Sequence, residues 1–160
     1  MKAITYIQSG YLLFLGAWLG LAAFGNVVDR GTNRALLQSM LSMKLIQEPP
    51  LMGSGIWPRA IERAAVCNLI LWAIVFAQVC IALLLLRAGF AISTQGMNST
   101  TLESAHIALG LFGGLWAGFM TGGLWFGYWM KTWHLQLVHM MLIVFTLLGF
   151  SLLNIQPRFL

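Results

Sequence analysis

The sequence predicts an all-α membrane protein with four transmembrane helices in one bundle. Of its 160 residues, 59% are hydrophobic and only 8% are charged, whereas about a quarter of the residues of a soluble domain are charged. Four apolar stretches are each long enough to cross a bilayer, at about residues 4–28, 64–87, 105–128 and 135–153. The chain is too small for several domains, so residues 1–160 are expected to form a single four-helix transmembrane domain.

The first stretch is expected to remain in the membrane as a helix. Its apolar run from Ala3 to Gly25 is longer than the apolar part of a signal peptide. Gly16 and Gly20 give this helix a face of small residues, which lets a neighbouring helix approach closely.

The long first loop contains a short amphipathic helix, at about residues 33–46. Asn26 and Asp29 end the first membrane helix, and Thr32 or Asn33 can cap the amphipathic one. Its apolar positions recur at helical spacing: Leu36, Leu37, Met40, Leu41 and Leu45. Such a helix lies along the membrane surface or docks on a partner.

The third stretch carries four glycines at strict four-residue spacing: Gly110, Gly114, Gly118 and Gly122. Each step of four residues turns the helix by about 400°, so the strip of glycines moves about 40° around the helix at each step. A strip without side chains favours close packing against another helix. The small residues of the first helix, Gly16 and Gly20, are the expected partner.

Aromatic residues gather where the third stretch ends. Trp125, Trp129 and Trp133 recur every four residues, so on a continuous helix they form one aromatic face. The simplest interpretation is the aromatic belt of a membrane boundary. The alternative is a quinone or lipid pocket, since the first and third loops lie on the same side of the membrane. The candidate ligand or partner site comprises Asn26, Asp29, Asn33, Arg59, Trp125, Trp129, Trp133 and Gln136.

The sequence favours a non-catalytic protein. Its four carboxylates lie at helix ends or in loops: Asp29, Glu48, Glu62 and Glu103. None falls in the middle of an apolar stretch, where a proton relay or a coupled transporter needs one. No segment resembles a phosphate-binding loop, a nucleophile elbow or a zinc site. The sequence therefore predicts neither catalytic residues nor a metal site.

Two histidines are candidate axial ligands. His106 opens the third helix and His139 lies in the first half of the fourth. In an antiparallel helix pair these side chains are separated by about 25–30 Å, so they cannot hold one haem within one chain. A haem or pigment bound by a single histidine, or shared between two chains, remains an alternative. No cofactor is predicted, with haem, pigment and quinone as the alternatives.

The formal net charge of +5 does not indicate nucleic-acid binding, because the nine Lys and Arg residues form no basic run. These residues are better interpreted as side chains that anchor the protein at the lipid headgroups. Six of them fall on the side of the first loop: Arg30, Arg34, Lys44, Arg59, Arg63 and Lys131. Lys2, Arg87 and Arg158 fall on the other side. The positive-inside rule then places the first loop in the cytoplasm of a multi-pass protein of the bacterial cytoplasmic membrane.

Several polar and aromatic residues carry a resemblance to a known family: Asn26-Val27-Val28-Asp29, Thr32-Asn33, Leu41-Ser42-Met43, Arg59-Ala60-Ile61, Gly122-Gly123-Leu124-Trp125-Phe126, and Trp129 and Trp133 through Gln136. With them the chain resembles the bacterial small integral membrane proteins named domain of unknown function 2165. The resemblance implies four membrane helices and a long first loop, and it implies no activity. Leu124 stands where the family usually has an acid, and His134 stands where it usually has Asn.

Two functions are compatible with the sequence. The first is an accessory or structural subunit that packs against a larger respiratory or photosynthetic membrane complex, or that self-associates. The second is a membrane module that binds quinone, lipid, haem or pigment at the aromatic boundary between Trp125 and Trp133. The expected partners are membrane lipids and other membrane subunits or a second copy of the chain.

Overall fold

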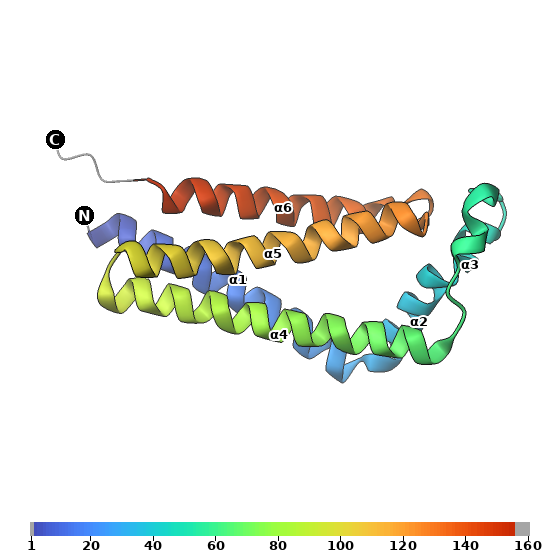
Figure 1. Ribbon diagram of the computed structural model, residues 1–160, viewed down its shortest axis with the longest axis horizontal. Coiled ribbons are helices and arrows are strands. Elements are labelled where there is room, and N and C mark those ends of the chain that lie inside the picture. Colours follow the sequence, from blue (N-terminus) through green and yellow to red (C-terminus); the bar gives the residue numbers. More distant parts are fainter. Residues whose placement is uncertain (1, 156–160) are drawn as a thin grey trace.

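The computed structural model describes residues 2–155, and within them it contains helices and no strand (Figure 1). Four helices are long and apolar enough to cross a membrane: α1 (Lys2–Val28), α4 (Ala64–Gln95), α5 (Ser99–Trp125) and α6 (Trp133–Leu153). The connections hold shorter elements: α2 (Arg30–Leu41), α3 (Lys44–Gln47), η1 (Ser54–Arg59) and η2 (Tyr128–Met130). The predicted fold class, an all-α membrane protein with four spanning helices and an amphipathic helix in the first loop, is confirmed.

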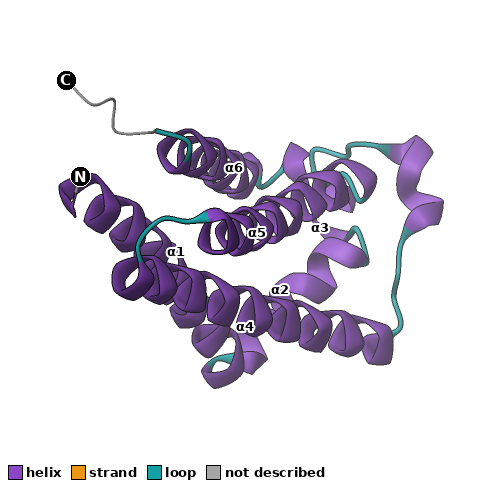
Figure 2. Ribbon diagram, turned by 60° about the vertical axis from the view of Figure 1, so that its left-hand side comes forward, coloured by secondary structure: helices purple, strands orange, loops and turns teal. Residues whose placement is uncertain are grey.

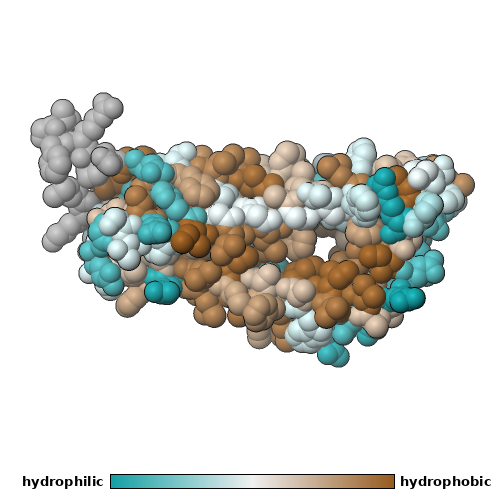
Figure 3. All heavy atoms as spheres, viewed as in Figure 1, coloured by the Kyte–Doolittle hydropathy of each residue, from teal (hydrophilic) through white to brown (hydrophobic). Residues whose placement is uncertain are grey.

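The long helices run side by side, with the connecting elements collected at one end. The N-terminus and the link between α4 and α5 lie at one end of the molecule, whereas α2, α3 and the turn before α6 lie at the other (Figures 1 and 2). Hydrophilic residues gather at both ends and hydrophobic residues cover much of the length between them (Figure 3). A bilayer with two polar boundaries requires this distribution.

Two of the spanning helices differ from their predicted bounds. The second was expected to end near residue 87, but α4 continues to Gln95 because Phe90 and Ile92 extend its apolar surface. Gly96 then stops the helix with a φ of 76°. The third was expected from residue 105, but α5 begins at Ser99. A reciprocal pair of hydrogen bonds between Asn98 and Thr101 caps this start.

The amphipathic helix of the first loop is shorter than expected and broken. It was predicted over residues 33–46, whereas α2 ends at Leu41 and α3 begins at Lys44. Met43 takes a left-handed conformation with φ 57°, which interrupts the helix. Met40 and Leu41 are buried while Arg34 is exposed, so α2 is amphipathic as predicted.

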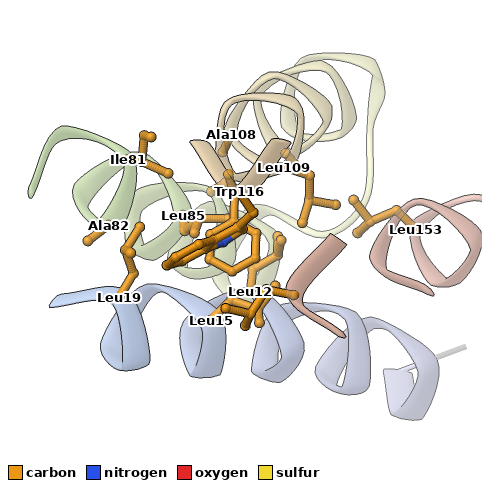
Figure 4. Packing of buried hydrophobic residues seen from close by; sticks show 14 of the residues in the cluster. Leu12, Leu15, Leu19, Ile81, Ala82, Leu85, Ala108, Leu109, Trp116 and Leu153 are labelled. Carbon is orange, nitrogen blue, oxygen red and sulfur yellow. The ribbon is translucent and has the colours of Figure 1, made fainter. Parts of the chain in front are cut away.

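The core of the protein joins all four spanning helices (Figure 4). Its largest fully buried side chains include Leu12 and Leu15 of α1, Leu85 of α4, and Phe112 of α5. Leu142 and Leu153 extend the cluster onto α6. Within this bundle α1 packs mainly on α4, whereas α5 packs on α6 and to a similar extent on α4.

Close contact between α1 and α4 depends on one glycine from each helix. A Cβ atom on Gly16 would lie 2.9 Å from Leu86 Cγ and 3.1 Å from Ala82 O. A Cβ atom on Gly89 would lie 2.8 Å from Leu13 Cγ and 3.0 Å from Ser9 O. The Ser9 hydroxyl also donates a hydrogen bond to Gly89 O, with an Oγ–O distance of 2.7 Å. Gly16 therefore packs as predicted, but against α4 and not against the third spanning helix.

The predicted role of the glycine strip in α5 is wrong within the chain. A Cβ atom at Gly110, Gly114, Gly118 or Gly122 would have no atom within 4 Å other than those of its chain neighbours and of the adjacent backbone of the same helix. Gly20 is also loosely packed, with Ala82 Cβ at 3.9 Å. The contact between α5 and α6 uses Gly113 and Gly123, where Thr146 and Gln136 occupy the space of a Cβ atom. These glycines lie one residue from the strip, about 100° around the helix.

We expect Gly89→Leu to destabilise the protein and Gly110→Leu to leave its stability nearly unchanged. The side chain at position 89 would collide with the backbone of α1, which costs about 1–3 kcal/mol of unfolding free energy. The two variants add the same side chain to a spanning helix, so they form a matched pair. Thermal unfolding in detergent micelles measures the difference. Equal melting temperatures for the two variants would contradict this account of helix pairing.

Candidate functional site

A cavity of about 940 Å³ lies between the spanning helices, at the end where the connecting elements gather. It is lined by residues of α1, α2, α4, α5 and α6 together with Tyr128 of η2. The core cluster fills the other part of the bundle, and Trp116 belongs both to the core and to the cavity wall. The cavity therefore begins where the large core side chains end.

Three glycines of the α5 strip line this cavity: Gly114, Gly118 and Gly122. With no side chain at these positions, the cavity keeps volume that a Leu or Phe would occupy. A pale strip follows α5 across the face shown in Figure 3, and a gap separates α5 from α4 on that face. The absence of side chains at these three glycines therefore leaves the cavity wider on the side of α5.

Most of the cavity wall is apolar. Leu36, Leu37 and Met40 line it from α2, and Ile70 and Ile74 line it from α4. This use of α2 explains the amphipathic pattern of the first loop, because the apolar side of the helix covers the cavity and also packs on α4.

A pair of amides forms the main polar feature of the wall. Asn26 Nδ2 donates a hydrogen bond to Gln78 Oε1 at 2.8 Å, joining α1 to α4. Gln78 is only 4% exposed, and the described residues show no hydrogen bond for its Nε2 group. Asp29 is exposed, and its carbonyl oxygen accepts a hydrogen bond from Asn33 Nδ2 at 2.9 Å. Both residues line the cavity at the end of α1 and the start of α2.

Aromatic residues of α5 and α6 form another part of the cavity wall. The Trp116 and His139 rings stack with centroids 5.6 Å apart, and Phe119 lies 5.1 Å from His139. Trp116 Nε1 and His139 Nδ1 are buried, and neither has a hydrogen-bond partner among residues 2–155. A buried polar atom without a hydrogen-bond partner costs about 1–3 kcal/mol. These two atoms therefore destabilise the folded chain as long as nothing else bonds to them.

Tyr128 closes the cavity beside α5. Its hydroxyl donates a hydrogen bond to Phe119 O at 2.9 Å. Tyr128 lies outside the spanning helices, and burial raises the pKa of its hydroxyl. The group therefore stays protonated at neutral pH and holds η2 against the end of α5.

The first loop folds onto the turn between α5 and α6. The Arg59 guanidinium lies 4.4 Å from the centre of a Trp125 ring, and its Nη1 donates to Trp125 O at 3.3 Å. Lys131 Nζ donates to Glu48 O at 3.2 Å. Gly127, with a φ of 66°, lets Ile56 approach the turn closely. These contacts join the loop to the elements at this end of the bundle.

The structure divides the residues of the predicted ligand or partner site. Asn26, Asp29 and Asn33 line the cavity together, whereas Arg59 and Trp125 contact each other but do not line it. The others do not line the cavity: Trp129 and Trp133 are exposed, and Gln136 is buried against Gly123 with no hydrogen-bond partner for its amide atoms in the described part of the chain.

The predicted aromatic face is not formed by one helix. α5 ends at Trp125, Trp129 lies in η2, and Trp133 begins α6. The left-handed turn at Gly127 separates them. The four-residue spacing therefore does not place these three rings on one helical surface.

The two candidate axial histidines lie in different parts of the bundle. His106 Nε2 lies 3.3 Å from Asn154 Nδ2 near the end of α6, and its ring lies 5.5 Å from Phe150. His139 lines the cavity instead, and the 15 residues of helix between positions 139 and 154 extend over about 22 Å. One haem cannot be held by both within the chain. In residues 2–155 no group of three His, Cys, Asp or Glu side chains is arranged to hold a metal ion.

Sequence reasoning missed the roles of Trp116, Phe119 and Tyr128. Gln78 was recognisable as a polar residue inside an apolar helix, which indicates contact with another helix. Its partner, Asn26, could not be chosen because the residues are 52 positions apart. The aromatic residues gave no signal, because aromatic side chains are common throughout this chain.

The four apolar helices, the polar boundaries at both ends and the cavity within the bundle define a small integral membrane protein. A family model described as "Predicted small integral membrane protein (DUF2165)" matches residues 4–156. The chain belongs to this family, as its sequence motifs indicated. No curated protein and no solved structure gave a significant match.

We expect Arg59→Ala to loosen the first loop. The change removes a cation–π contact and a hydrogen bond, which at an exposed position together contribute about 1–2 kcal/mol. Limited proteolysis should then cut faster within residues 48–59. Arg63→Ala is the matched control, because its exposed side chain contacts neither Trp125 nor Glu48. Identical cleavage rates for the two variants would show that the Arg59 contacts do not hold the loop.

Proposed function

We propose that this protein is a non-catalytic membrane module that binds one quinone-like or lipid-like molecule in the cavity between α1, α2, α4, α5 and α6. The observation that carries the proposal is the cavity itself, with a volume of about 940 Å³ and a mostly apolar wall. Binding sites for small molecules commonly measure about 300–1,000 Å³ and combine apolar walls with a few polar groups that fix orientation. The second of the two functions compatible with the sequence is therefore preferred, with the site moved from the aromatic boundary into the bundle.

The wall supports a ligand with an apolar body and a polar end. Ile70, Ile74 and Leu36 offer apolar contact, while Asn26 and Gln78 offer hydrogen-bonding groups at one place on the wall. We propose that such a molecule enters through the opening between α4 and α5 that Figure 3 shows. No step of this function requires a catalytic group.

A second candidate function is packing against another membrane subunit, of a larger complex or a second copy of the chain. It is favoured by Gly110 and Gly114, which are exposed on α5 and have no contact that a Cβ atom would disturb. An exposed pair of glycines at four-residue spacing is suited to close helix contact. Purification in mild detergent tests this candidate: a lone monomer with no co-purifying protein would count against it.

We further propose that the protein resides in the bacterial cytoplasmic membrane with the first loop in the cytoplasm. Arg30, Arg34, Lys44, Arg59, Arg63 and Lys131 support this orientation because they lie at the loop end of the bundle. Arg158, which was counted for the other side, lies outside the described residues. Alkaline phosphatase fused after residue 160 should be active and green fluorescent protein fused there should be dark. The opposite result would reverse the orientation.

We expect Gly118→Leu to reduce the amount of bound ligand about tenfold relative to the unchanged protein, because the new side chain occupies the cavity. Gly110→Leu should retain the ligand, since Gly110 lies on the same helix but does not line the cavity. The measurement is native mass spectrometry of protein taken from membranes, followed by solvent extraction of the bound molecule.

Two results would contradict the proposal. One is the same ligand content in both leucine variants. The other is an absorption band of haem or pigment that is lost in His139→Ala, which would replace the quinone or lipid by a cofactor bound to a single histidine.

A further inference from the structure

The amide pair in the cavity wall has hydrogen-bonding capacity that the protein does not use. Gln78 Oε1 accepts from Asn26 Nδ2 at 2.8 Å, and the described residues show no hydrogen bond for Gln78 Nε2. The side chain is 4% exposed and lines the cavity. Gln78 lies about 21 Å along α4 from Ala64, well inside the spanning helix. An amide donor in the cavity wall at that depth is suited to an acceptor oxygen of a bound molecule.

The charges of the cavity wall restrict the head of that molecule. The lining contains no Lys or Arg among the described residues, and Asp29 is its one carboxylate. A phosphate placed beside Gln78 would be a buried anion without a counter-charge, which is strongly unfavourable. Asp29 would repel the same anion as it entered. An ammonium group cannot accept the hydrogen bond that Gln78 Nε2 offers, so that donor would stay without a partner.

The rest of the wall accommodates an apolar chain. From Gln78 the apolar surface of Ile74 and Ile70 continues along α4, and Gly114 and Gly118 line the cavity from α5. Figure 3 shows an opening in the surface between these two helices, bordered by hydrophobic residues. A head held at Gln78 can therefore keep its chain in lipid.

We infer that the cavity selects a neutral amphiphile whose head presents a carbonyl oxygen to Gln78 Nε2 and whose apolar chain leaves between α4 and α5. This inference rests on the proposed binding function and names the chemical class of its ligand. A prenylated quinone and a diacylglycerol share this chemistry, whereas anionic phospholipids and alkyl amines do not.

The test uses the full chain in phosphatidylcholine nanodiscs, with decylubiquinone as the probe. Quinones quench tryptophan fluorescence, and Trp116 lies in the cavity wall. Gln78→Met keeps the size of the side chain and removes the amide, so we expect the Kd to rise about tenfold, the effect of one lost hydrogen bond. Asn68→Met is the matched control, because it removes an amide from the same helix at a residue that does not line the cavity.

Competition identifies the head without any substitution, so the inference stays testable if Gln78→Met fails to fold. Dioleoylphosphatidylglycerol and dodecylamine should not displace the probe. If dioleoylglycerol displaces the probe, the ligand class includes glycerides. If it does not, the cavity recognises the quinone ring. Displacement by the anionic lipid or the amine, or an unchanged Kd in a folded Gln78→Met variant, would overturn the inference while leaving the binding function intact. If the unchanged protein binds neither decylubiquinone nor dioleoylglycerol, the proposed function itself fails.

Discussion

The close contact between α1 and α4 at Gly16 and Gly89 is the constraint on which the rest of the structure depends. In lipid, an apolar side chain gains nothing by leaving its solvent, so helices associate through close packing and hydrogen bonds. At these two glycines the backbone of one helix meets side chains and carbonyl oxygens of the other. Ser9 adds a hydrogen bond to Gly89 O. The contact commits α1 to α4, and α5 then pairs with α6 through Gly113 and Gly149.

A bundle made of two tight pairs has a seam between them, and the sequence fills this seam unevenly. Leu12, Leu85 and Phe112 close it over part of its length. Toward the connecting elements the large core side chains of α5 stop at Trp116 and Phe119, and Gly118 and Gly122 line the cavity there. The pairs are then held apart at this end, and α2 covers the space that results. The cavity thus follows from which residues the two pairs place along their common seam.

The sequence was sufficient to predict the environment and the number of spanning helices, because both follow from the length and composition of apolar stretches. It was not sufficient to predict which helices pair. Small residues occur on every spanning helix, and the regularly spaced glycines from Gly110 to Gly122 pack closely against no other helix in the described part of the chain. The true contact at Gly113 differs by one residue, which turns the direction of the side chain by about 100°.

Part of the site was predictable from the sequence, because Asn26, Asp29 and Asn33 are polar residues that follow the first apolar stretch. Trp116 and Gln78 become part of a site only when tertiary packing brings distant stretches together.

The energetic cost of the cavity is an argument about its purpose. Each glycine inside a helix costs about 0.5–1 kcal/mol relative to alanine, and three of them line the cavity on α5. Trp116 Nε1 and His139 Nδ1 add buried polar atoms without partners in the described residues. Gly114 and Gly118 have no neighbour that would prevent an alanine, so packing within the chain does not require them. A subunit that served only by its outer surface would gain stability by filling this space with apolar side chains. A protein that must admit a molecule between its two helix pairs has a reason to keep the glycines and the unpaired polar atoms.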